Sequence, residues 1–468
     1  MQVLVLLAFV VTLTAFQASA GPPVLTGWGW SLAAVGAYLV LASVLNGVNS
    51  VLSLRALRGA AELPRPAARR HALLTLLAHA WLVGGLAGVV MLGYGWWLKE
   101  DLGLGRLPLV GEIAAVAPFA VALLVTWVLE YPFHRASRSW MAAGEAPAGR
   151  PFWTLSEYLG YNTRHHLLFI AVPVSLIILA TDLTRQHLGP VLPDGPIGSA
   201  LLLGAMLGST ALVFFFTPML VVRIWKTRPL PAGALRSDLE DLCRRMDLRY
   251  RKILIWQSGG VIANAGVMGL AAPVRYILLS DALLENLDRR QVMAIFAHEA
   301  GHVVSHHILY STIFAMASAI LCISLGSVLA DAAGWPKNAE LLALPLLAMV
   351  WAVGFGWVSR RFEWQSDAIS AWALGDEPPS PAGTVTPEGA AVFAQALECV
   401  GRLNGIPYRQ HNWRHGSIER RVGEVLWLGS TGGTRRGIDR VVRRIKLGLW
   451  VAVLAAVAVT AVELAYGG

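Results

Sequence analysis

The stretch that decides the fold is residues 291–307, which read QVMAIFAHEAGHVVSHH. His298 and His302 are four residues apart, so on a helix their imidazoles lie on one face and can hold a single metal ion. Glu299 stands beside them, where its carboxylate can hold a water molecule. This HExxH pattern is typical of zinc-binding helices. The pattern alone leaves open the alternative of an amphipathic helix with incidental histidines.

A catalytic zinc site usually has three protein ligands and keeps the fourth position for water. The candidate for the third ligand is Glu363, in the stretch RRFEWQSD at residues 360–367. Asp367 follows four residues later on the same helical face, where its carboxylate can hydrogen-bond to a ligating histidine. His307 lies just beyond the HExxH pattern. It is either a similar partner of a ligand or a polar residue at the start of the next apolar stretch.

The chain as a whole is too apolar for an ordinary soluble protein, since 56% of its 468 residues are hydrophobic and 14% are charged. The net charge of +9 fits basic loops on the cytoplasmic side of a membrane better than nucleic-acid binding, because no recognition motif accompanies it. We therefore expect the lipid bilayer as a partner and no nucleic acid. Eight apolar stretches are long enough to cross a bilayer of about 30 Å: 30–52, 73–96, 113–131, 166–184, 198–222, 310–331, 341–358 and 447–465.

The arginines and lysines of the loops predict the orientation. Their bias places residues 53–72, 132–165, 223–309 and 359–446 in the cytoplasm. The expected fold class is mainly α: a polytopic helical membrane protein with a cytoplasmic α+β zincin-like catalytic domain split by a transmembrane hairpin. The expected order is a signal peptide or first membrane helix at 1–29, a membrane domain of five helices at 30–222, a first catalytic segment with HExxH at 223–309, the hairpin at 310–358, a second catalytic segment with the third ligand at 359–446 and a C-terminal membrane helix at 447–468. The first twenty residues fit a cleaved signal peptide as well as a retained helix.

Four stretches resemble the integral-membrane zinc metallopeptidases, the family of the type I CAAX prenyl endopeptidase and the HtpX-type heat-shock membrane protease. They are residues 263–284, which approach the zinc helix, HEAGH with His307 downstream, residues 361–367, and HGSIERR at 415–421. The two apolar stretches between the second and third ligands also resemble the family's arrangement. Gly416 is a departure, because the family usually has proline at this position.

The resemblance implies one Zn²⁺ per chain, and it assigns a role to each site residue. His298, His302 and Glu363 are the expected zinc ligands, with Glu299 as the general base that takes a proton from water. His415 and Arg421 are the expected donors to the carbonyl oxygen as charge develops on it. Residues 253–269 read as strands, and an extended polypeptide could pair with them near Asn264 and Ala265.

The expected function is a membrane-embedded zinc-dependent endopeptidase, a hydrolase that cleaves membrane or membrane-associated polypeptides. CAAX-type processing of prenylated C-termini is one alternative, suggested by five spans before the catalytic segment and by LSEYLGYN at 155–162. A non-catalytic membrane sensor or scaffold that keeps the protease fold is another. A transporter is disfavoured because the motifs fall in cytoplasmic segments rather than at mid-membrane. The arginine-rich, lysine-poor composition indicates a bacterial plasma membrane, which favours general or regulatory proteolysis over CAAX processing.

Overall fold

The computed structural model describes residues 1–19, 27–57, 63–144, 153–260, 262–334, 339–375 and 383–466. The chain forms two compact units, Met1–Lys226 and Thr227–Gly468. Each unit is described by itself below.

The first unit is helical throughout. Its α-helices are α1 (Gln2–Ala18), α2 (Trp28–Leu57), α3 (Arg65–Ala80), α4 (Leu86–Val89), α5 (Val110–Gly144), α6 (Leu155–Asn162), α7 (Phe169–Leu188) and α8 (Pro196–Ile224). Wider π-type turns continue several of them, at η1 (Trp81–Gly85), η2 (Val90–Tyr94), η3 (Trp97–Asp101) and η5 (Thr163–Leu168), and the short 3₁₀ turns are η4 (Leu104–Arg106) and η6 (Gly189–Val191).

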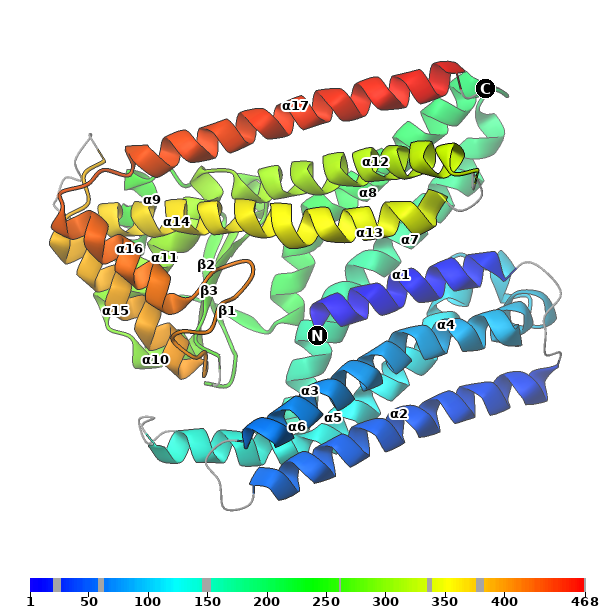
Figure 1. The fold of residues 1–468 in the computed structure, drawn as a ribbon, viewed down its shortest axis with the longest axis horizontal. Coiled ribbons are helices and arrows are strands. Elements are labelled where there is room, and N and C mark those ends of the chain that lie inside the picture. Colours follow the sequence, from blue (N-terminus) through cyan, green and yellow to red (C-terminus); the bar gives the residue numbers. More distant parts are fainter. Residues whose placement is uncertain are drawn as a thin grey trace. The chain divides into compact units, whose positions relative to one another are not determined.

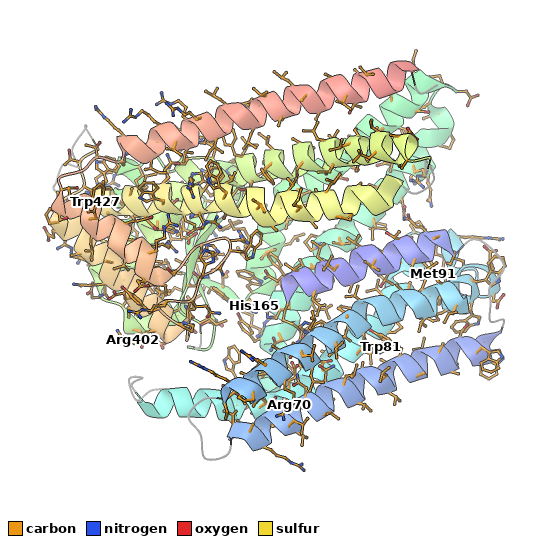
Figure 2. All side chains as sticks on the ribbon, in the orientation of Figure 1. Arg70, Trp81, Met91, His165, Arg402 and Trp427 are labelled. Atoms are coloured by element: carbon orange, nitrogen blue, oxygen red, sulfur yellow. The ribbon has the colours of Figure 1, made fainter. Side chains whose placement is uncertain are left out.

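Within this unit, α1, α2, the α3–α4 helix and α5 lie side by side (Figure 1). Their shared core contains the large side chains of Tyr38, Phe119 and Trp127, each at most 1% exposed. Other apolar side chains project outward along the helices, as Met91 does at 60% exposure (Figure 2). Outward apolar side chains along long helices are the arrangement that hydrocarbon favours.

Seven helices among the described residues are long and apolar enough to cross a membrane: Trp28–Leu57, Arg65–Tyr94, Val110–Ser137, Leu155–Val191, Ile197–Ile224, His307–Ala332 and Arg436–Val462. They overlap seven of the eight predicted spans, and the protein is an integral membrane protein. The eighth span, 341–358, is helical but is not among the seven. Helix α1 is a shorter apolar helix, and residues 20–26 after it lie outside the described residues. The choice between signal peptide and retained helix therefore stays a prediction.

The second unit contains a four-stranded sheet in the order β1-β2-β4-β3. Its strands are β1 (Thr227–Pro229), β2 (Lys252–Trp256), β3 (Ala265–Met268) and β4 (Tyr276–Ser280). Strand β2 runs parallel to β4, and the two outer strands pair antiparallel to their neighbours. All five residues of β4 are buried, as expected for an apolar central strand. Strand β3 lies at an edge of the sheet.

The helices of the second unit are α9 (Ala234–Arg245), α10 (Asp281–Asn286), α11 (Arg289–Val304), α12 (His307–Ala332), α13 (Ala339–Met349), α14 (Gly356–Ala373), α15 (Pro387–Leu403), α16 (Ile418–Ser430) and α17 (Arg436–Tyr466). The π-type turn η9 (Val350–Phe355) joins α13 to α14. The long helices α12, α13–α14 and α17 lie side by side, and α11, α15 and α16 gather with the sheet near one end of them (Figure 1). This architecture confirms the predicted fold class. The division of the chain into the six segments given above stays a prediction.

Candidate metal centre

Helix α11 places three of the predicted residues, His298, Glu299 and His302. It begins at a capping box, in which Asp288 accepts from the backbone of Gln291 and the Gln291 side chain accepts from the backbone of Asp288. The two histidines lie one turn apart, and their Nε2 atoms are 3.2 Å apart. The spacing in the sequence therefore produces the expected pair of convergent imidazoles.

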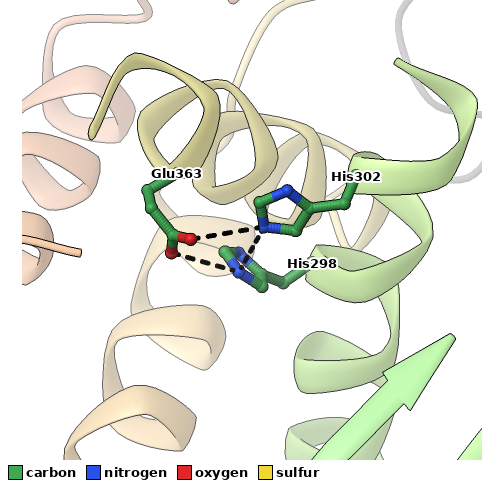
Figure 3. Close-up of side chains that lie close together, drawn as sticks. All are labelled: His298, His302 and Glu363. Atoms are coloured by element: carbon green, nitrogen blue, oxygen red, sulfur yellow. Dashed lines mark hydrogen bonds and ion pairs between the residues drawn. The ribbon is translucent and has the colours of Figure 1, made fainter. Parts of the chain in front are cut away.

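Helix α14 brings Glu363 to the same point (Figure 3). Its Oε2 lies 3.6 Å from Nε2 of His298, and its Oε1 lies 3.6 Å from Nε2 of His302. Gly301 permits the close approach of the two helices, because a Cβ there would lie 3.2 Å from the Cα of Ser366. One ligand atom from each of the three side chains lies within 4.8 Å of the others, so together they could hold a metal ion.

The side chains that converge here carry atoms that can bind a metal ion. Nδ1 of His298 lies 2.8 Å from Oδ1 of Asp367, a carboxylate that can only accept, so Nδ1 carries the proton. In the neutral ring, Nε2 of His298 then has a lone pair, and it lies 3.2 Å from Nε2 of His302 and 3.6 Å from Oε2 of Glu363. Three such groups that converge at one point can hold a metal ion between them. Two imidazole nitrogens and a carboxylate oxygen are donors that suit Zn²⁺.

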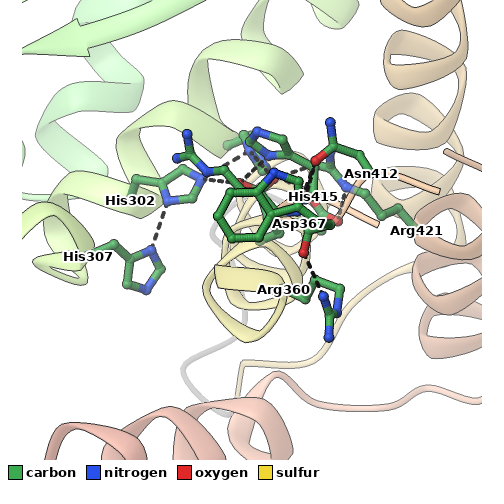
Figure 4. Close-up of polar contacts among 11 residues, drawn as sticks. His302, His307, Arg360, Asp367, Asn412, His415 and Arg421 are labelled. Carbon is green, nitrogen blue, oxygen red and sulfur yellow. Dashed lines mark hydrogen bonds and ion pairs between the residues drawn. The ribbon is translucent and has the colours of Figure 1, made fainter. Parts of the chain in front are cut away.

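Two further side chains hold the carboxylates in place (Figure 4). Arg421 donates from Nε and Nη2 to the two oxygens of Asp367, at 2.9 and 2.6 Å, and its Nη2 lies 3.3 Å from Oε2 of Glu363. Nδ1 of His415 lies 2.8 Å from Oε1 of Glu363. Burial opposes the ionisation of Glu363, but Arg421 and then His415 hold its pKa well below the usual range. Burial likewise opposes ionisation of Asp367, and Arg421 reverses this and lowers its pKa.

The pKa values of His298, Glu299 and His302 are each shifted by their surroundings. Burial, followed by the neighbouring His298, lowers the pKa of His302 to about 3, so its ring is neutral and its nitrogen lone pair is available. For His298 burial acts in the same sense, but Asp367 outweighs it and raises the pKa. Burial raises the pKa of Glu299 to about 7, with Glu363 adding to the effect. A carboxyl group with this pKa can exchange a proton at neutral pH.

A cavity of about 1080 Å³ opens onto the centre. His298, His302, Glu363, His415 and Arg421 form its polar wall, and Asn264 and the β3 residue Ala265 line another side. Apolar side chains from α12 and η9, among them Ile308, Trp351 and Phe355, complete the lining. A large pocket with an apolar lining and a few convergent polar groups is the usual form of a ligand-binding or active site.

His415 reaches the cavity from a tight turn before α16. The side-chain oxygen of Asn412 accepts from the backbone of Arg414 and of His415, and the backbones of Asn412 and Gly416 pair with each other. Gly416 adopts φ +79°, which the ring of proline excludes. The departure from the family's usual proline therefore follows from the conformation of this turn.

Nine of the ten predicted site residues line the cavity, and Asp367, the tenth, lies behind His298. His415 and Arg421 both contact Glu363, and their role as donors to a carbonyl oxygen stays a prediction. Two residues not predicted from the sequence, Gln365 and Asp439, belong to a line of hydrogen bonds behind His302. No local motif marks Asp439.

A helix with HExxH, a glutamate from a second helix and a carboxylate behind one histidine together form the donor arrangement that suits a zinc ion. In agreement with this, residues 229–388 match the family model described as Peptidase family M48. The resemblance to integral-membrane zinc metallopeptidases is thereby confirmed.

Known proteins similar to this chain carry two kinds of name. A "CAAX prenyl protease 1 homolog" of Arabidopsis thaliana is 25% identical over 232 residues, which are 45% of this chain and 54% of that protein. A "Protease HtpX homolog" of Desulforapulum autotrophicum is 28% identical over 214 residues, 42% of this chain and 63% of that protein. The chain thus spans somewhat over half the length of these curated relatives. The crystal structure of S. mikatae Ste24p aligns with 86% of this chain and all of that chain, at 15% identity and a TM-score of 0.49.

Proposed function

We propose that this protein is a zinc-dependent endopeptidase that hydrolyses peptide bonds of polypeptides in or near the membrane. The observation that carries the proposal is the convergence of His298, His302 and Glu363 in one cavity with Glu299. The relatives named as proteases, and the match to a peptidase family, support the same activity.

His298, His302 and Glu363 would hold one zinc ion per chain. When bound, zinc supplies a Lewis acid for the scissile carbonyl and lowers the pKa of a water molecule. Glu299 takes a proton from the attacking water and returns it to the leaving amine, which its pKa of about 7 permits. His415 and Arg421 fix the carboxylate of Glu363 and stand at the cavity wall, where they can donate to the carbonyl oxygen.

The polypeptide substrate binds in extended form along β3. Among the described residues, β3 pairs with β4 on one side only, so its other edge can accept a further strand. Asn264, just before this strand, and Ala265, its first residue, line the same cavity as the candidate metal ligands. Backbone hydrogen bonds along the edge would set the register of the substrate, and the cavity would receive its side chains.

The catalytic segments face the cytoplasm, and the membrane is the plasma membrane of a bacterium. The support is the arginine bias of the loops and the overall composition. Regulatory or general proteolysis is the favoured role. Processing of prenylated C-termini is the second candidate, because relatives from Arabidopsis thaliana and Saccharomyces cerevisiae are named CAAX prenyl proteases.

The test is cleavage of a quenched fluorescent peptide, with zinc content measured in parallel, on the full chain purified in detergent. We expect Glu299→Gln to keep zinc and lose cleavage, because it removes the base and no ligand. Glu240→Gln is the control, since that carboxylate pairs with Arg236 on α9 outside the cavity. Equal cleavage by the Glu299→Gln variant would reject the mechanism.

The same assay separates the candidate functions. Faster cleavage of a farnesylated peptide than of its unmodified form would favour the CAAX role, and equal rates would favour general proteolysis. Zinc binding by the wild-type protein without cleavage of any peptide would instead indicate a non-catalytic sensor or scaffold.

A further inference from the structure

A line of hydrogen bonds runs from the ligand His302 to the C-terminal helix α17. Nδ1 of His302 lies 2.9 Å from Nδ1 of His307, and Nε2 of His307 lies 2.8 Å from Oε1 of Gln365. Nε2 of Gln365 then donates to Oδ1 of Asp439 at 2.6 Å. The four residues come from four helices, α11, α12, α14 and α17. Figure 4 shows His302 between His307 and the group around Asp367.

Metal binding through Nε2 of His302 would determine which nitrogen atom carries the proton in each ring of this line. A ligand that binds through Nε2 carries its proton on Nδ1, so His302 donates to Nδ1 of His307. The proton of His307 then lies on Nε2 and is donated to the side-chain oxygen of Gln365. The amide nitrogen of Gln365 donates in turn to the carboxylate of Asp439. Each hydrogen bond in the line is thus donated in the direction of Asp439, and hydrogen bonds arranged in this way polarise one another.

Burial and ring stacking hold the side chains of His307 and Gln365 in one arrangement. His307 is 2% exposed and Gln365 is 6% exposed, and the ring of His307 stacks on Phe362 with 4.2 Å between centroids and 4° between planes. The side chain of Asp439 is 26% exposed, so the negative charge lies at the end of the line that solvent can reach. Its place in the first turn of α17 also suits a carboxylate, because the helix dipole is positive there.

The chain turns sharply where the line leaves α11. His306, between α11 and α12, has φ +56°, a left-handed conformation that non-glycine residues rarely adopt. The turn brings the ring of His307 back against the ring of His302. On the other side of the same junction, Nζ of Lys446 on α17 donates to the backbone oxygen of Ser305 at 2.6 Å. Helix α17 therefore contacts the end of α11 through Lys446 and contacts α14 through Asp439.

We propose that Asp439 is a positioning residue for the metal centre, acting through Gln365 and His307 to fix the ring and the tautomer of His302. This inference rests on the zinc binding proposed above. It gives each histidine ligand a carboxylate: Asp367 contacts His298 directly, and Asp439 serves His302 across two side chains. Helix α17, which the sequence presents as a membrane anchor, thereby becomes part of the metal centre.

The test measures zinc affinity of the full chain in detergent, by competition with a chromophoric chelator, so that it does not depend on cleavage. Asp439→Asn keeps an oxygen that can accept from Gln365 but removes the charge. We expect its zinc affinity to fall about 10-fold, the lower end of the effect of partners behind metal ligands. Asp238→Asn is the matched control: its carboxylate is 22% exposed and pairs with Arg289 at the far end of α11. This control should bind zinc as the wild type does.

A rescue separates positioning from mere stabilisation of the fold. Gln365→Glu, added to Asp439→Asn, places a carboxylate directly on Nε2 of His307 and should restore zinc affinity. Unchanged affinity in Asp439→Asn, equal losses in Asp439→Asn and Asp238→Asn, or no recovery in the double variant would overturn the proposal. Zinc binding by a wild-type protein that cleaves nothing would reject the endopeptidase activity and leave this inference standing.

Discussion

Replacement of Arg421 tests how the carboxylates of the centre are held. The side chains of Asp367 and Glu363 are 1% and 7% exposed, and Arg421 contacts both. In Arg421→Ala the two carboxylates lose their buried cation, which costs about 3–5 kcal/mol when one partner of a buried pair is removed. The neighbour Arg420 is a matched control, because it is 55% exposed and pairs with Glu424 on the surface. Arg420→Ala should cost less than about 1 kcal/mol.

The assay is chemical unfolding of the metal-free protein in detergent, with Asp367→Asn and the double variant completing a cycle. In the double variant no charged Asp367 is stranded, so its loss should be smaller than the sum of the two single losses by about 0.5–3 kcal/mol.

The pH dependence of the Arg421→Ala loss has a definite sign. The pKa of Asp367 is lowered from its ordinary value of 3.8 in the folded protein, so its contribution to stability is present above that value and is lost as the pH falls through the folded pKa. The difference between wild type and Arg421→Ala should therefore be largest at neutral pH. Equal losses in the Arg421 and Arg420 variants, or strictly additive losses in the cycle, would refute the reasoning.

Three further predictions concern single residues. The pKa of Glu299 is raised from 4.5 to about 7, so ionisation of this group lowers the stability of the folded protein increasingly from pH 4.5 to 7. Glu299→Gln should therefore raise the melting temperature of the metal-free protein more at pH 8 than at pH 5. A difference that does not change with pH would contradict this. Glu363→Ala removes a ligand, so the dialysed protein should contain less zinc by atomic absorption; full occupancy would mean that another side chain is the third ligand. Gly416→Pro cannot adopt φ +79°, so it should displace His415 and lower kcat/KM while zinc content is kept, and unchanged kinetics would show that the turn does not matter.

The parts of the centre that the sequence predicted are those whose geometry is local. His298 and His302 converge because residues four apart share a helical face, and Asp367 lies one turn from Glu363 for the same reason. The membrane helices follow from apolar length alone. The strand at Ala265 was also expected, but its position at the edge of the sheet depends on the order β1-β2-β4-β3, which brings β4 between two strands that precede it.

By itself, then, the sequence determined the membrane class, the two histidines with their glutamate, and the candidates for the remaining ligands. Only the tertiary structure decided which side chains support those ligands. Arg421 meets Asp367 across 54 residues, and Gln365 meets Asp439 across 74. Contacts over such separations are set by how α14, α16 and α17 pack together, and helical or strand periodicity carries no information about that packing. The residues behind His302 therefore became visible only once the helices were assembled.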